Sequence, residues 1–190
     1  MIAGYISYFG LQTWWLSLPE SDRNFILKTF TPMSSVDAGL ISGEIHYYSG
    51  SAVMYLTTMA EWFVKTFHIA KLILEKAENL INNTTSVTDK NYFYSIAAEI
   101  YYKQYARDPR SELLDKCISI CEKSIEIAPE IALLNKNKKL WPLSHPGYET
   151  MLNIQYFLDN RTKVEQLVSK VKSEGWSGKW DRFLDFEDED

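Results

Sequence analysis

The residues of this chain that could do chemistry are few, and the two cysteines are the first to consider. Cys117 and Cys121 lie four positions apart, which places both on one face of a helix. A structural zinc site needs four ligands, usually in close pairs, but the histidines stand singly at His46, His68 and His145. A free cysteine otherwise behaves as a small apolar residue. We therefore expect both cysteines in the core and no metal site.

Catalytic motifs are absent from the sequence. It contains no glycine-rich phosphate loop, no Gly-x-Ser-x-Gly elbow and no His-Glu-x-x-His helix. Two pairs of glutamates share predicted helices with lysines: Glu75 with Glu78, and Glu122 with Glu126. Such neighbours favour solvated ion pairs over acid–base chemistry. We expect a protein that is not an enzyme and uses no cofactor.

The composition indicates a folded chain and disfavours two classes of partner. Hydrophobic residues make up 46% of its 190 residues and aromatic residues 14%, which excludes a disordered chain and fits one domain, 1–190. The formal net charge of −5 disfavours nucleic acid and anionic membranes as partners.

The location of the protein is predicted from its first residues and its cysteines. The opening MIAGYISYFGLQTWWLSL is apolar, but it lacks a basic leader and is too short for a membrane span. Two cysteines four apart on a straight helix have poor geometry for a disulfide, and so few cysteines fit a reducing compartment. We expect a cytoplasmic protein.

The elements that position these residues are clearest at 91–129, where two amphipathic helices are predicted. The first carries Tyr94, Ala97, Ala98 and Tyr101 on one face, at offsets of three, four and seven. The second carries Cys117, Cys121, Ser124 and their neighbours on one face, and Pro129 is expected to end it. Small residues at Ala97, Ala98 and Ser124 would allow two helices to approach closely.

This hairpin resembles a tetratricopeptide (TPR) repeat, most specifically in AEIYYKQ followed by EKSIEIAP. Two departures are present. Ala97 stands where the family usually has leucine, and the connection QYARDPRSELLDK is longer than the family's tight turn. The resemblance implies an all-α fold, a TPR-like α-α solenoid of antiparallel hairpins.

Weaker copies of the same spacing flank the central hairpin. Pairs of helices are predicted at 51–82 and 147–173, so the chain has about three hairpins within 51–175. The aromatic-rich residues 1–50 are interpreted as N-terminal capping helices, including a short helix around 37–48. Residues 185–190 form an acidic tail.

Binding residues follow only from the resemblance, because the first helix of each TPR pair lines a concave groove. The corresponding positions here include Phe63, Glu99, Tyr102, Lys103, Glu149, Asn153, Tyr156 and Phe157. Packing of Phe63, Tyr102 and Tyr156 against neighbouring helices is an equally good interpretation. Glutamates at this face would repel a carboxylate and favour a cationic or apolar ligand.

Two functions remain open from the sequence. The first is a non-enzymatic protein–protein interaction scaffold that binds a peptide or partner helix in the groove. The alternative is a small-molecule-binding regulatory helical domain. An open groove with exposed Tyr102 and Tyr156 would favour the scaffold, and a deep closed pocket with converging polar groups would favour the alternative. The sequence leaves the oligomeric state open.

Overall fold

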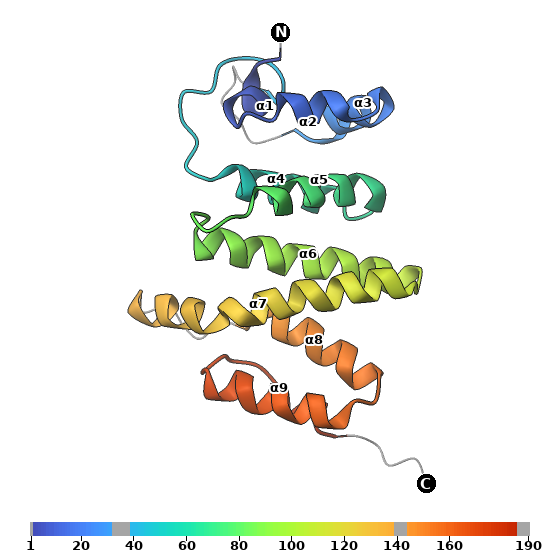
Figure 1. The fold of residues 1–190 in the computed structure, drawn as a ribbon, viewed down its shortest axis with the longest axis vertical. Helices are drawn as coiled ribbons and strands as arrows, with labels where there is room; N and C mark the ends of the chain where they lie inside the picture. The colour runs from blue at the N-terminus through green and yellow to red at the C-terminus, as the bar shows by residue number, and fades with distance from the viewer. Residues whose placement is uncertain (1, 32–38, 139–143, 186–190) are drawn as a thin grey trace. The chain divides into compact units, whose positions relative to one another are not determined.

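The expected all-α class is confirmed by the structure. The computed structural model describes residues 2–31, 39–138 and 144–185. Within these ranges the chain forms nine α-helices, one short 3-10 helix and no strand (Figure 1). It divides into two compact units, Met1–Asn83 and Thr84–Asp190, which we call unit 1 and unit 2. The interpretation of 1–190 as one domain stays a prediction.

Unit 1 contains the predicted N-terminal helices and the first predicted hairpin. Its helices are α1 (Gly4–Tyr8), α2 (Gln12–Ser17), α3 (Glu20–Thr29), α4 (Ala52–Trp62) and α5 (Phe67–Leu80). Helices α4 and α5 pack against each other. Aromatic rings join α4 to the first helix, where Tyr5 of α1 stacks on Tyr55 of α4 with 4.8 Å between ring centroids. The side chain of Ser51 caps α4 by accepting the Met54 N–H at 3.1 Å.

The helix expected around 37–48 is wrong for the described part of that segment, since residues 39–50 are irregular. Residues 37 and 38 lie outside the described residues. Carbonyl oxygens of this segment instead accept hydrogen bonds from N–H groups at the start of α1. The N–H groups of Ala3, Gly4, Tyr5 and Ile6 bond the carbonyls of Ile41, Gly43, Gly39 and Leu40, respectively. These bonds satisfy the helix's first N–H groups, and Gly43 takes a φ of 76°, which interrupts a helix.

Unit 2 contains the other two predicted hairpins. Its elements are α6 (Val87–Arg107), α7 (Ser111–Asn137), α8 (Pro146–Phe157), α9 (Arg161–Ser173) and η1 (Trp180–Phe183). Helix α6 packs along α7, α8 packs against both of them, and α9 packs against α8 (Figure 1). The predicted small residues lie in this core. Ala97, Ala98, Cys117 and Cys121 are all fully buried.

The prediction that Pro129 ends the second helix of the central pair is wrong. Helix α7 continues through Pro129 to Asn137. A proline inside a helix removes one backbone hydrogen bond and crowds the preceding turn. Ala128 and Ile131 are buried on either side of it, so apolar packing continues across the proline and offsets this cost.

The end of unit 2 is closed by two buried tryptophans. Gly175 takes a φ of 81° just after α9, and the following Trp176 and Trp180 are buried. The Trp180 indole N–H donates to the Trp176 carbonyl at 3.0 Å. Residues 186–190 of the predicted acidic tail lie outside the described residues.

The burial of the cysteines predicts slow thiol chemistry. The Cys117 thiol donates to the Ala98 carbonyl at 3.5 Å. The pKa of Cys121 is raised, first by its hydrogen bond with Cys117 and then by burial, and the thiolate is the reactive form. We expect a chromogenic disulfide reagent to react with the cysteines of the native protein at least about 100-fold more slowly than with those of the urea-unfolded protein. Equal rates would contradict the buried placement.

None of the helices within the described ranges combines the length and apolarity that crossing a bilayer requires.

Candidate functional site

The predicted groove residues belong to both units and differ in exposure. Phe63 belongs to unit 1, is 1% exposed and packs against Phe25 with 5.8 Å between ring centroids. Its burial removes it from the accessible candidates, as the packing interpretation of the aromatic residues allowed. In unit 2, Tyr102 and Asn153 are half-buried, whereas Tyr156 is exposed.

The two glutamates of the predicted groove face in unit 2 each form an ion pair. Glu99 pairs with Lys103 one turn away on α6, with both side chains about half exposed. Glu149 pairs with Arg182 at 2.9 Å. Because each glutamate already faces a cation, the expectation that these carboxylates would attract a cationic ligand is weakened.

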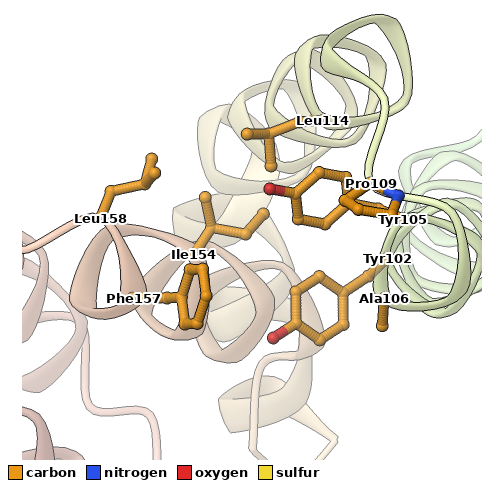
Figure 2. A pocket seen from close by; sticks show the side chains of 8 residues that line it. All are labelled: Tyr102, Tyr105, Ala106, Pro109, Leu114, Ile154, Phe157 and Leu158. Carbon is orange, nitrogen blue, oxygen red and sulfur yellow. The ribbon is translucent and has the colours of Figure 1, made fainter.

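An apolar pocket lies in unit 2 between the C-terminal ends of α6 and α8. We call it the α6–α8 pocket. Its volume is about 340 Å³. It is lined by Tyr102, Tyr105, Ala106, Pro109, Leu114, Ile154, Phe157 and Leu158. Figure 2 shows Tyr102 and Tyr105 reaching from α6 toward Ile154 and Phe157 of α8.

The lining of the α6–α8 pocket is uncharged. Its only polar side-chain atoms are the phenol oxygens of Tyr102 and Tyr105. Burial raises the pKa of Tyr102, and the neighbouring Cys117 and Tyr105 raise it further, so its phenol is neutral at pH 7. Apolar walls with two neutral hydrogen-bonding groups suit the burial of an uncharged ligand.

The repeat resemblance placed Tyr102 and Phe157 on groove faces of two different hairpins, but it did not bring them together in one pocket. It did not include Leu158, which continues the exposed wall at the end of α8; Phe157 is 80% exposed and Leu158 is 49% exposed. A signal was present: Tyr156, Phe157 and Leu158 form an apolar run directly before the turn at Asp159. Large apolar side chains at a solvent-exposed turn have no core to fill, and they mark a binding surface when they cluster.

A second hollow of unit 2 has mixed charge. Its volume is about 360 Å³, and its lining includes two glutamates and two lysines: Glu122, Glu126, Lys163 and Lys170. Opposite charges side by side give no net preference for an anion or a cation. In the part of the chain that the structure describes, no group of three or more metal-ligating side chains is close enough to hold a metal ion.

A buried polar cluster lies where α8 begins. The His145 Nδ1 caps α8 by accepting the Tyr148 N–H at 3.2 Å, and the imidazole packs on Trp176 with 4.7 Å between ring centroids. Glu174 accepts from the Tyr148 hydroxyl at 2.9 Å and from the Trp176 indole N–H at 3.1 Å. Burial lowers the pKa of His145 to about 4.

This cluster is closed to solvent. His145 is 1% exposed. Its Nε2 and the Ser124 Oγ are buried without a hydrogen-bond partner among the described residues. A serine and a histidine are thus near each other, but a substrate has no access to them, and we assign the cluster a structural role.

The fold and the site together define an all-α protein with an apolar pocket in its second unit. Comparison of the sequence with protein-family models finds no match, and no curated protein or solved structure is significantly similar to it.

Proposed function

We propose that this protein is a non-enzymatic binding scaffold that takes a peptide or a partner helix on the surface of unit 2 around the α6–α8 pocket. The observation that carries the proposal is the continuity of this apolar pocket with exposed apolar side chains at the end of α8. Phe157 and Leu158 line the pocket and are also open to solvent. Exposed apolar surface beside a pocket is typical of protein-interaction sites.

The packing within unit 2 supports a TPR-like arrangement for this scaffold. In a stack of helical hairpins, each new hairpin packs on its predecessor. Helix α8 packs against both helices of the preceding hairpin, and α9 packs back on α8. Helices α6 and α7 approach closely at the small residue Ala98, whose carbonyl accepts from the Cys117 thiol, and this also supports paired helices of the TPR kind.

Composition supports a protein partner and a cytoplasmic location. The net charge of −5 favours a protein over a nucleic acid. Cys117 and Cys121 are free thiols, which suits a reducing compartment such as the cytoplasm.

Removal of Tyr102 should weaken partner binding. Tyr102 is half-buried at the pocket, so truncation to alanine removes apolar contact area with the partner more than core packing. We expect Tyr102→Ala to lower the affinity for peptides selected on the full chain by at least about tenfold, near 1.4 kcal/mol, with a stability change below about 1 kcal/mol. Binding is measured by calorimetry and stability by urea unfolding.

The control for this variant is Tyr47→Ala, because Tyr47 is 79% exposed and belongs to unit 1. It should leave peptide affinity unchanged. Unchanged affinity of Tyr102→Ala, or a loss of stability large enough to unfold it, would contradict the proposed role of Tyr102.

A second function, a small-molecule-binding regulatory domain, is favoured by the size of the same pocket. Its volume of about 340 Å³ falls at the lower end of the range of roughly 300–1,000 Å³ that small-molecule sites occupy. A metabolite extract that stabilises the wild-type protein against heat, with no peptide selected, would favour this second function.

A further inference from the structure

The α6–α8 pocket has aromatic side chains on facing walls. Tyr102 and Tyr105 come from α6, and Phe157 comes from α8. In Figure 2 the rings of Tyr102 and Phe157 lie on opposite sides of the space, and Ile154 lies above Phe157 in this view. Aromatic rings attract other rings in stacked or edge-to-face arrangements at centroid separations of roughly 4.5–7 Å. A flat ring entering this space would contact π-faces or edges on two sides.

The geometry points to a binding site for one flat, uncharged aromatic ring. Resting on the proposed scaffold function, we assign this ring to a tryptophan or tyrosine side chain of the partner segment. Such a side chain is large enough to use the pocket and is typical of the residues that dominate binding energy at interfaces.

Charge is the first reason for an uncharged ring. All eight lining side chains are neutral, and the turns that flank the pocket each contain an ion pair. Arg110 pairs with Asp108 at 2.8 Å, and Arg161 pairs with Asp159 at 3.4 Å. A charged ligand would lose its hydration in the pocket and meet no opposite charge in the lining, which is unfavourable.

Hydrogen bonding is the second reason, and it favours a ring with a polar edge. The phenol oxygens of Tyr102 and Tyr105 lie on the side of their rings that faces α8 (Figure 2). A phenol oxygen accepts a hydrogen bond from an indole N–H or donates one to another phenol oxygen. Tryptophan and tyrosine therefore satisfy both the apolar walls and these two groups, whereas phenylalanine or leucine satisfies only the walls.

The experiment titrates the full chain with indole, followed by amide chemical-shift changes in 1H–15N NMR spectra. We expect a Kd on the order of 1 mM, as befits a fragment of this size. The shifts should centre on residues 102–114 and 154–158. Indole-3-acetate and tryptamine carry opposite charges, and each should bind at least about fivefold more weakly than indole.

Two variants test the location. Ala106 is an exposed lining residue, so Ala106→Trp fills the pocket from its rim without disturbing the core, and it should weaken indole binding at least about tenfold. Its matched control is Arg107→Trp, which adds the same side chain at the next exposed position of α6, outside the lining, and should bind indole normally. Phe157→Ala removes an exposed wall and provides a second test if Ala106→Trp misfolds.

The inference is overturned if indole causes no shifts at these residues. It is equally overturned if Phe157→Ala and Ala106→Trp bind indole like the wild type, or if either charged analogue binds more tightly than indole. Failure of the scaffold function gives a different result. If selected peptides need Tyr102 for binding but indole does not displace them, the scaffold function is supported and the aromatic-ring site is contradicted. If indole binds but no peptide can be selected, the aromatic-ring site is supported and the scaffold function is contradicted.

Discussion

Gly147→Ala is expected to destabilise unit 2 by about 2 to 3 kcal/mol, because α8 meets α7 too closely there for a methyl group. A Cβ at Gly147 would lie 2.5 Å from the Oγ and 2.7 Å from the Cβ of Ser124, and 3.1 Å from the Cε1 of His145. The Ser124 Cβ is fixed to the backbone of α7 and cannot rotate away. Urea unfolding followed by circular dichroism measures the loss.

A second substitution tests the cause. Ser124→Gly removes the two atoms that the new methyl group would strike, at a cost of about 1 kcal/mol for glycine inside a helix. We expect the Ser124→Gly/Gly147→Ala double variant to be more stable than Gly147→Ala alone, with a favourable coupling energy of about 2 kcal/mol that exceeds the cost of the glycine. Additive effects of the two substitutions would show that the helices do not meet at this point.

Acidification should destabilise the protein through His145. Its folded-state pKa of about 4 lies below the ordinary value of 6.5 because burial disfavours the imidazolium. The neutral form is thus favoured by folding. The stabilisation is fully present above about pH 6.5 and is lost as the pH falls toward 4, because the unfolded chain takes up the proton first. The loss approaches about 3 kcal/mol near pH 4.

Comparison of variants isolates this contribution from that of the carboxylates. His145→Asn keeps a side-chain oxygen that can cap α8 but does not titrate. Between pH 7 and pH 4.5, the free energy of unfolding of this variant should fall by about 2 kcal/mol less than that of the wild type. His68→Asn is the control, since that side chain is 66% exposed, and its pH dependence should match that of the wild type. Parallel curves for all three proteins would disprove the role of His145.

Much of the helical core could be predicted from the sequence, because periodic apolar spacing reports burial directly. The offsets placed Ala98 and Cys117 on the buried faces of their helices, and in the structure these two residues are in contact. Ser124 was expected to allow close approach of the two helices of the central hairpin, but its close neighbour is Gly147 of α8. The spacing within one helix shows which face is buried; it does not show which other helix covers that face.

The errors in the fold arose where tertiary contacts override local signals. Pro129 is a strong local stop signal, yet buried residues on both sides of it keep α7 continuous. The irregular segment at 39–43 has its carbonyls bonded to α1, and no pattern within the segment itself reports a bond to a residue so far away in sequence.

The candidate site was the least predictable part. A repeat resemblance supplies positions along each helix, and Tyr102 and Phe157 were placed on groove faces in this way. The pocket, however, is completed by Pro109, in a connection longer than the family's turn, and by Leu158, in the turn after α8. Residues in connections have no place in the repeat pattern, so only their exposed apolar character indicates them.

The bonds between α1 and residues 39–43 also determine the order in which unit 1 can form. A five-residue helix is too short to be stable alone, and its first amides find their acceptors only in a distant part of the chain. On a ribosome, α1 therefore stays unstructured until residues 39–43 have emerged. In refolding, the chain must close that long loop before α1 docks, which makes it a late event compared with the pairing of α4 and α5.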